Sequence, residues 1–294
     1  MTSSFQLGTD GGQRWRDLGM RMATAAVAIP LVIVGLLWLP ISIIIAIFGL
    51  TMAIGAHEWS RLVEAGAAGH VMLIFVTLAL TAFGVKLILV SSPVASIVFA
   101  VGVAMGLLAS LAGVWMVCTA ATEVPINLIR GALGWFFGAF VFIGALAALA
   151  SIGSGVGGGQ RILMFFVLIW LVDVGGYAAG RLIGGFKLAP RVSPRKTWAG
   201  AIAGVAAAAA AAGIYGGLFN TDADGWVFAL AGAWLAMVSI FGDLTVSLLK
   251  RRAGLAETGV LFPGHGGVLD RLDGLVFAAP WFALIALWLF FWNV

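Results

Sequence analysis

Long apolar runs separated by short polar breaks make up most of this sequence. Nine of the runs come close to the roughly 20 residues that a helix needs to cross a bilayer. They occupy residues 22–39, 41–57, 71–90, 94–117, 131–150, 161–180, 200–219, 226–248 and 274–293. The pattern predicts an all-α, polytopic integral membrane protein with about nine transmembrane helices.

The composition supports this class. The chain has 294 residues, of which 62% are hydrophobic and only 10% are charged, whereas soluble domains carry roughly 25% charged residues. The single cysteine, Cys118, excludes an internal disulfide and a cysteine-based zinc site. A polar start leads into the first apolar run without a small-residue cleavage site, so we expect an uncleaved first span rather than a signal peptide.

The positions of Lys and Arg predict the orientation. Cytoplasmic loops of membrane proteins are enriched in these residues. If the N-terminus is cytoplasmic and nine spans alternate, fourteen of the 16 basic residues fall on the cytoplasmic side. Arg161 alone falls opposite, and Lys86 lies near the outer end of its span. An eight- or ten-helix arrangement loses this asymmetry, so we expect a cytoplasmic N-terminus and nine spans.

Half of the charged residues lie in two cytoplasmic segments, 173–200 and 243–274. Both segments begin inside an apolar run, the sixth and the eighth, rather than after it. We therefore expect these two helices to be neighbours around one polar cavity.

The segment 242–274 combines acidic and basic residues. A charged side chain such as Asp243, inside the eighth run, costs roughly 2.5–3.5 kcal/mol at a span's centre and is tolerated where it faces protein or water. Ser247 lies one turn on and shares its face, and Lys250 and Arg251 extend that stripe. The alternative is that the basic residues only anchor the helix at the membrane surface.

Asp270 and Asp273 stand three residues apart at the start of the ninth run, with Arg271 between them. If this segment is helical, the two carboxylates share a face. Magnesium prefers carboxylate oxygens and completes its shell with water and substrate phosphate. The alternative is acidic capping of a helix N-terminus, which explains one aspartate more readily than two.

Two further features suit phosphate binding. The glycine-rich turn Pro263–Gly267 offers backbone N–H groups to an anion, and His265 inside it is a candidate donor. A simple turn with a structural histidine is the alternative. Ser193, Lys196 and Thr197 stand near a predicted helix start, where phosphates bind readily. A basic loop against anionic lipid headgroups is the competing interpretation.

Four polar residues lie at the C-terminal end of the second apolar run. We assign them a structural role and no chemistry: His57, Glu58, Arg61 and Glu64.

Together the two charged segments resemble the signature of phosphatidate cytidylyltransferases, also called CDP-diglyceride synthetases, over about residues 170–280. The first part of the resemblance is Ser247-Leu-Leu-Lys250-Arg251, followed by Pro263-Gly264-His265-Gly266-Gly267-Val-Leu-Asp270-Arg271-Leu-Asp273. The second part comprises Asp173, Tyr177, Gly180, Arg181 and Ser193-Pro-Arg-Lys196-Thr197-Trp. The sequence departs from the family pattern at Ala199, Ala256 and Glu257, where Glu, Lys and Asp are usual.

The resemblance implies transfer of CMP from CTP to phosphatidate, which gives CDP-diacylglycerol and pyrophosphate. It implies catalytic roles for Asp243, Asp270, Lys250 and Arg271. It implies Mg²⁺ on Asp243 and Asp270, with Asp273 or Asp173, and leaves open a second, monovalent cation. The substrate-binding residues that it implies are Ser193, Lys196, Thr197, Ser247, Arg251, His265, Gly266 and Gly267.

The same resemblance predicts the organisation and partners of the chain. An N-terminal arm (1–21) and N-terminal helices (22–160) precede a catalytic region (161–294) with two cytoplasmic loops. The expected location is the cell (inner) membrane, with the site facing the cytoplasm and contacting membrane lipids. A homodimer is an open alternative, and no nucleic acid partner is expected.

Two rival functions are compatible with parts of the pattern. A CTP-dependent polyprenol or lipid kinase transfers only the γ-phosphate, and the signature disfavours it. A cation-coupled transporter would use the intramembrane Asp173 and Asp243. Transporters often carry inverted repeats with sites at the midplane, whereas this sequence shows no repeat and its charges gather at one membrane face.

Overall fold

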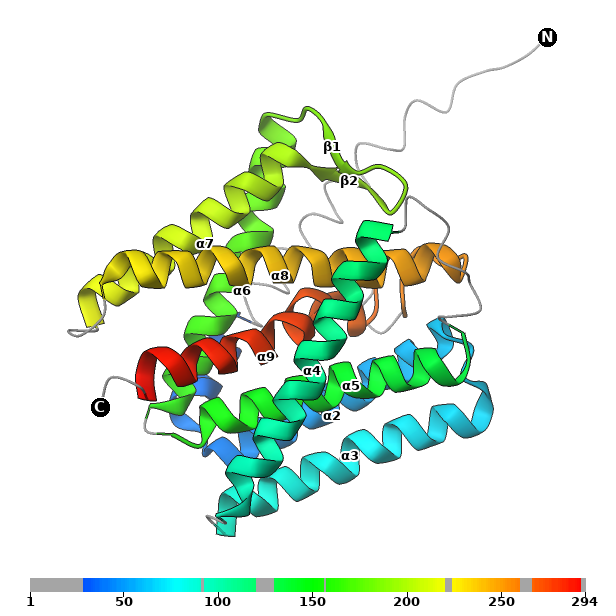
Figure 1. Cartoon of the computed structure of the whole chain (residues 1–294), viewed down its shortest axis with the longest axis vertical. Helices are drawn as coiled ribbons and strands as arrows, with labels where there is room; N and C mark the ends of the chain where they lie inside the picture. Colours follow the sequence, from blue (N-terminus) through cyan, green and yellow to red (C-terminus); the bar gives the residue numbers. More distant parts are fainter. Residues whose placement is uncertain are drawn as a thin grey trace.

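The computed structural model describes residues 29–90, 93–119, 130–155, 157–219, 224–259 and 266–291, which form a helical bundle with one small β-ribbon (Figure 1). A short helix, Ile29–Trp38, comes first. The other elements are α2 (Ile41–Leu62), α3 (Gly66–Val90), α4 (Val94–Thr119), α5 (Ala132–Gly153), α6 (Gly158–Leu182), β1 (Lys187–Ala189), β2 (Ser193–Thr197), α7 (Trp198–Phe219), α8 (Gly225–Arg252) and α9 (Leu269–Phe291).

Within the described ranges, the 8 helices α2 to α9 are long and apolar enough to cross a membrane. Each coincides with one of the predicted spans to within a few residues. The first predicted span, 22–39, is described only from residue 29 on, and its described part is helical. Large apolar side chains such as Phe75 and Leu218 stay exposed on the outside of the bundle. The chain is therefore a multi-pass membrane protein of the predicted all-α class.

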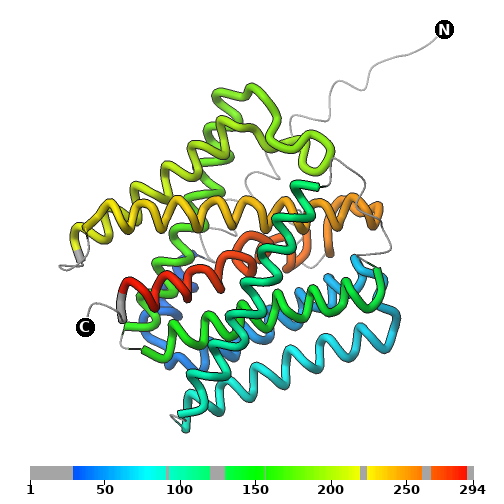
Figure 2. Tube along the Cα trace, viewed as in Figure 1, coloured from blue at the N-terminus to red at the C-terminus, as the bar shows by residue number. Residues whose placement is uncertain are grey.

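Helix α9 runs through the middle of the bundle, and the tube view follows it between α8 and α5 (Figure 2). It packs against α2, α4, α5, α6 and α8. Its side chains Phe277 and Phe282 are buried, and the Ser110 hydroxyl of α4 donates a 2.8 Å hydrogen bond to the Phe277 carbonyl. The helix begins at Leu269, earlier than the predicted start at residue 274, so its first turns carry the acidic residues of the signature.

The strands β1 and β2 form an antiparallel hairpin between α6 and α7, where the sequence alone predicts a loop. Lys187 pairs with Thr197, and Ala189 pairs with Ser193. The hairpin contacts α6, α7 and α8. It therefore joins the ends of α6 and α7 and brings Lys196 to Asp243 within α8.

Glycines let α6 and α7 approach each other closely. A Cβ atom on Gly200 would lie 2.6 Å from the Gly176 carbonyl oxygen, and one on Gly204 would lie 2.7 Å from that of Val172. Backbone-to-backbone packing of this kind is typical of helices in membranes. Helix α6 also contacts α8, and both line one polar cavity, which confirms that the sixth and eighth spans are neighbours.

Candidate active site

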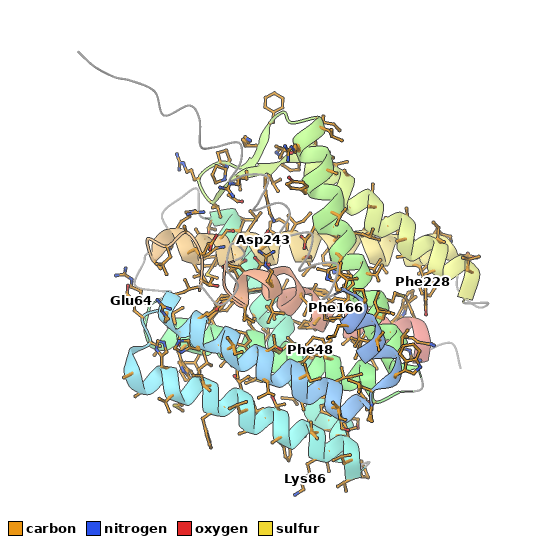
Figure 3. All side chains as sticks on the ribbon, turned by 180° about the vertical axis from the view of Figure 1, so that it is seen from behind. Phe48, Glu64, Lys86, Phe166, Phe228 and Asp243 are labelled. Atoms are coloured by element: carbon orange, nitrogen blue, oxygen red, sulfur yellow. The ribbon has the colours of Figure 1, made fainter. Side chains whose placement is uncertain are left out.

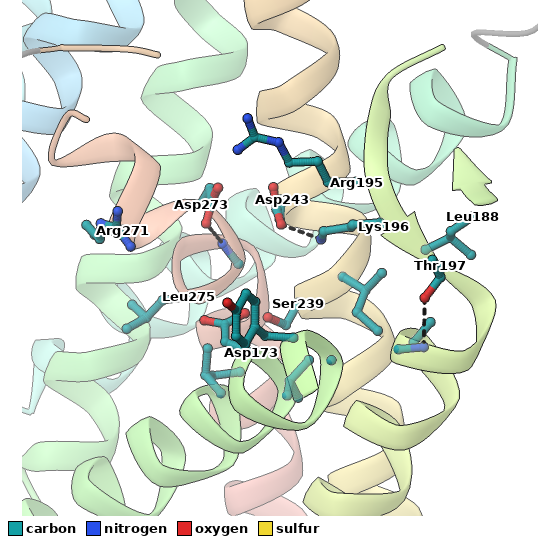
Figure 4. A pocket seen from close by; sticks show the side chains of 18 residues that line it. Asp173, Leu188, Arg195, Lys196, Thr197, Ser239, Asp243, Arg271, Asp273 and Leu275 are labelled. Atoms are coloured by element: carbon teal, nitrogen blue, oxygen red, sulfur yellow. Dashed lines mark hydrogen bonds and ion pairs between the residues drawn. The ribbon is translucent and has the colours of Figure 1, made fainter. Parts of the chain in front are cut away.

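A cavity of about 240 Å³, lined by both acidic and basic side chains, lies where α6, β2, α8 and α9 meet. We call it the inner cavity, and Figure 4 shows the side chains that line it. Figure 3 places Asp243 inside the protein, beneath the hairpin. The charged residues of its wall come from four separate elements: Asp173, Arg195, Lys196, Asp243, Arg271 and Asp273.

Asp243 is the best-connected carboxylate of the inner cavity. The Lys196 ammonium group, which comes from β2, forms an ion pair with its Oδ2 atom (Figure 4). The Ser247 hydroxyl donates a 3.2 Å hydrogen bond to Oδ1, which confirms that these two residues share a helix face. The Asp243 and Lys196 side chains remain 27% and 28% exposed, so solvent and ions reach the pair.

Two more carboxylates face Asp243. Asp273 interacts electrostatically with both Asp243 and Asp173, and its Oδ1 atom accepts a 2.8 Å hydrogen bond from the Gly274 N–H. Asp173 also interacts with Lys196 and Arg271. Three carboxylates, from α6, α8 and α9, thus share one small space with Arg195, Lys196 and Arg271, and a cation that takes the place of one of these basic groups meets oxygens from three helices.

A second cavity of about 600 Å³ adjoins the first. We call it the outer cavity. The two cavities are neighbours, because Arg195 and Arg271 line both of them. The outer cavity is predominantly basic, and its polar lining consists of Arg191, Ser193, Arg195, Ser247, Lys250, Arg251, Glu257, Asp270 and Arg271. Such a set of donors suits a polyanion.

Asp270 faces the outer cavity, whereas Asp273 faces the inner one. The Lys250 ammonium group donates a 2.7 Å hydrogen bond to Asp270 Oδ1. The Oδ2 atom accepts bonds of 2.9 Å from the Thr258 and Gly267 N–H groups. Asp270 is therefore held by the protein on both oxygens, and the structure separates it from the carboxylates of the inner cavity.

An apolar groove of about 1050 Å³ runs beside both cavities, between the hairpin, α7 and α8. Leu188, Ala201 and Ile240 line the groove and the inner cavity, while Pro190 and Arg191 line the groove and the outer cavity. An amphiphilic molecule in this groove would place a polar end at the charged residues.

Thr197 lines the inner cavity and Arg251 the outer one, and both also bond to the protein backbone. Thr197 is buried, and its hydroxyl accepts a 3.1 Å hydrogen bond from the Gly200 N–H at the start of α7, so it caps that helix. Arg251 donates to the Val192 and Leu255 carbonyls over 3.4 Å and 3.3 Å. His265 lies outside the described residues.

The glycines of the signature turn are buried rather than open. Gly266 has a positive φ of 80°, which favours glycine. The Gly267 N–H is bonded to Asp270. A Cβ atom on Gly267 would collide with the Thr258 hydroxyl and the Glu58 carboxylate. These two glycines allow close packing of the turn against acidic side chains.

A metal is the group that this site implies. Within the described ranges, no three Asp, Glu, His or Cys side chains form a ready-made metal cage. Magnesium does not require one, because it usually takes one or two carboxylates together with waters and substrate phosphates. The carboxylates of the inner cavity, and Asp270 beside it, fit that mode, since Asp243 and Asp270 each already hold an ammonium cation.

Sequence reasoning missed two residues near the site, Glu58 and Thr258. Both are buried, and a 2.7 Å hydrogen bond joins the Thr258 hydroxyl to Glu58 Oε2. The sequence contained one signal for Glu58. It lies three residues after Gly55 and four before Leu62, which are both buried, so it sits on the apolar face of α2 rather than on a solvated end.

Comparison with known proteins adds the family. A model described as the cytidylyltransferase family matches residues 19–289. A phosphatidate cytidylyltransferase of Pseudomonas aeruginosa is 34% identical over 285 residues, which cover 94% of this chain and 99% of that protein. The proteins of the same name in Brucella suis and Haemophilus influenzae are 44% and 41% identical over 126 residues. Those matches span 45% and 44% of the relatives' own lengths.

Proposed function

The chain belongs to the cytidylyltransferase family, and we propose that it transfers CMP from CTP to phosphatidate, releasing pyrophosphate and forming CDP-diacylglycerol. The family and the names of the relatives indicate an enzyme of the nucleotidyltransferase class. CTP and phosphatidate are the substrates that follow from them.

One observation supports this function above the others: a cavity with three carboxylates, a predominantly basic cavity and an apolar groove adjoin one another at the hairpin. The reaction needs three such places. A cation needs carboxylates, a triphosphate needs basic side chains, and the acyl chains of the lipid need an apolar surface. The residues shared between neighbouring cavities bring these three requirements within one site.

The reaction requires positioning more than acid–base chemistry. An oxygen of the phosphatidate phosphate attacks the α-phosphorus of CTP, and a new P–O–P linkage forms. The bond from the α-phosphorus to the oxygen that bridges to the β-phosphorus breaks, and pyrophosphate leaves with that electron pair. Because the nucleophile is already an anion, the protein's task is to bring two anions together in line.

We assign the basic side chains to that task. Lys196, Lys250, Arg251 and Arg271 offset the negative charge of the two phosphates as charge shifts to the leaving group. Lys196 and Lys250 each form an ion pair with a carboxylate, which keeps their side chains oriented until a phosphate binds. Ser193 and Ser247 line the outer cavity, where their hydroxyls can donate to phosphate oxygens.

The acidic side chains would hold Mg²⁺. Asp243 and Asp270 are its proposed ligands, with Asp273 and Asp173 as further oxygens beside it. When bound, the metal neutralises phosphate charge and orients the triphosphate. A second, monovalent cation at the same carboxylates is part of the proposal.

We place the site at the cytoplasmic face of the cell (inner) membrane. The asymmetry of basic residues supports that orientation. CTP is water-soluble and would enter the outer cavity from the cytoplasm, while the lipid would enter the groove sideways from the membrane. Association into a homodimer stays a prediction.

Labelled CTP tests the function directly. The purified protein is incubated with phosphatidate, Mg²⁺ and CTP labelled at either the α- or the γ-phosphorus. We expect α-label in the lipid product and γ-label in pyrophosphate. A lipid kinase would place γ-label in the lipid and leave α-label in CDP, and a transporter would label no lipid. Either result would overturn the proposal.

A further inference from the structure

Glu58 is a buried carboxylate that the proposed reaction does not use. It lies in α2 and is 4% exposed. Its Oε1 atom accepts a 3.0 Å hydrogen bond from the Val268 N–H, and Oε2 accepts a 2.8 Å bond from the Leu269 N–H. Both donors are at the N-terminus of α9, where unpaired N–H groups and the helix dipole favour a negative charge.

Thr258 connects Glu58 to the active site. Its hydroxyl lies 2.7 Å from Glu58 Oε2 and 3.0 Å from Asp270 Oδ2. A hydroxyl carries a single proton, so it donates to one carboxylate at a time, and the shorter contact is the one to Glu58. The Thr258 N–H donates a second bond, of 2.9 Å, to Asp270. One residue thus links α2 to the carboxylate that pairs with Lys250.

Two glycines bring the backbone onto the Glu58 carboxylate. A Cβ atom on Gly259 or on Gly267 would collide with it. The chain therefore touches Glu58 both before and after the turn of the signature. The Glu58 carboxylate, the Thr258 hydroxyl and the Asp270 carboxylate form what we call the Glu58 hub.

We propose that Glu58 is a positioning residue for the transfer reaction: through Thr258 and the start of α9 it fixes the Asp270 carboxylate toward Lys250 at the outer cavity. Glu58 itself touches no substrate. This inference rests on the proposed function, and it gives the N-terminal helices a direct part in a site that is otherwise built by residues after 160.

The hydrogen-bond pattern explains why this position needs a carboxylate. Two backbone N–H groups and one hydroxyl all donate to it. In a glutamine, one terminal atom is an NH₂ donor, which would face donors and leave at least one of them unpaired. Glu58→Gln keeps the shape of the side chain and removes this acceptor, so it is the sharpest single change.

The experiment compares Glu58→Gln with Glu64→Gln in the full-length protein in detergent. Glu64 lies just beyond the end of α2, with its side chain 53% exposed. Residues that orient metal ligands typically contribute about 10- to 100-fold to activity. We expect kcat with CTP to fall by about that factor in Glu58→Gln, with the KM for phosphatidate within about twofold and Glu64→Gln unchanged. A fall confined to the amount of folded protein, with normal kcat per folded molecule, would overturn the positioning role.

A second pair of variants separates positioning from folding. Thr258→Ser keeps the bridging hydroxyl, whereas Thr258→Val removes it with little change of shape. We expect the serine variant to retain near-normal kcat and the valine variant to lose it as Glu58→Gln does. The double variant Glu58→Gln/Thr258→Val should lose no more kcat than either single variant, because both substitutions break the same link between Glu58 and Asp270. Multiplicative losses, or equal losses in the serine and valine variants, would contradict the bridge.

Hydrogen–deuterium exchange gives a readout that does not depend on activity. Loss of the Glu58 acceptor should speed exchange in the peptide containing residues 266–270 while peptides of α6 stay unchanged. Unchanged exchange at 266–270 would overturn the inference. A wild-type protein without transfer activity would instead overturn the proposed function, so the two failures are distinguishable.

Discussion

The inner cavity and the Glu58 hub both contain carboxylates, but these carboxylates have different exposure and different partners. In the inner cavity, Asp243 is 27% exposed and its ion-pair partner Lys196 comes from a hairpin. In the hub, Asp270 is 10% exposed and accepts hydrogen bonds from the Lys250 ammonium group and from the Thr258 and Gly267 N–H groups. The first cluster is open to ions, and the second is tied to the backbone of α9.

The difference shows how one acidic signature can serve two purposes. Carboxylates that retain free acceptor capacity and face a cavity can take a metal or reorient a lysine. A carboxylate that already accepts several N–H bonds, such as Asp270, in addition sets the shape of the turn and the orientation of a neighbouring side chain. Residue type alone does not distinguish these roles, because exposure and donor count decide them.

The largest expected effect is in the inner cavity. Asp243→Asn removes the charge that holds Lys196 and that we assign to the cation. We expect kcat for CMP transfer to fall on the order of 10³-fold, as with other lost electrostatic groups. The assay is incorporation of α-labelled CTP into lipid. The control is Asp224→Asn at the far end of α8, where the carboxylate bonds only to Trp226 among the described contacts. Equal activity in the two variants would remove Asp243 from the site.

The next effect lies between the two clusters. Lys250 pairs with Asp270 and lines the outer cavity. Lys250→Met keeps the stem of the side chain and removes the ammonium group, so we expect kcat/KM for CTP to fall by roughly 100-fold. Lys86→Met, on the exposed face of α3, is the matched control. An unchanged kcat/KM in Lys250→Met would show that the outer cavity does not bind the triphosphate.

A smaller effect, on stability, is expected in the hub. Gly267→Ala would push a methyl group into Glu58 and Thr258, and overpacking of this kind costs about 1–3 kcal/mol. Thermal unfolding in detergent measures it. Gly217→Ala on α7, which meets nothing within 4 Å, should cost nothing. A Gly267→Ala protein as stable as wild type would show that the turn does not pack tightly on the hub.

The smallest effect is at the surface near the hub. Glu64 and Arg130 form an ion pair 2.9 Å long with side chains 53% and 45% exposed, and exposed pairs contribute roughly 0–1 kcal/mol. Glu64→Gln should leave transfer activity unchanged and shift the unfolding midpoint only slightly. A large loss of activity would mean that this end of α2 acts on the site by a path other than Glu58.

Much of the fold could be predicted from the sequence, because each membrane-spanning helix appears in the sequence as a long apolar run. The runs from 41–57 onward match helices, and the pairing of Asp243 with Ser247 follows from helical spacing. The hairpin was not predictable in this way. Its strands are 3 and 5 residues long, and its polar composition is typical of a loop.

The site itself was only partly predictable. The sequence identified Asp173, Asp243 and Lys196 as candidates, and the structure brings them to one cavity. The sequence predicts that Asp270 and Asp273 share a face, whereas in the structure they line different cavities, because that depends on where α9 begins and how it packs. Glu58 was missed because its partners Thr258, Val268 and Leu269 lie 200 to 211 positions further along the chain.

Cation binding to the inner cavity is the most direct test of the account. Purified protein is titrated with Mn²⁺, as a paramagnetic substitute for Mg²⁺, in the presence of CTP, and free Mn²⁺ is followed by electron paramagnetic resonance. We predict that the wild type and Asp224→Asn bind the ion with CTP and that Asp243→Asn loses this binding. Wild-type Mn²⁺ affinity in Asp243→Asn would contradict the claim that the inner cavity is the cation site.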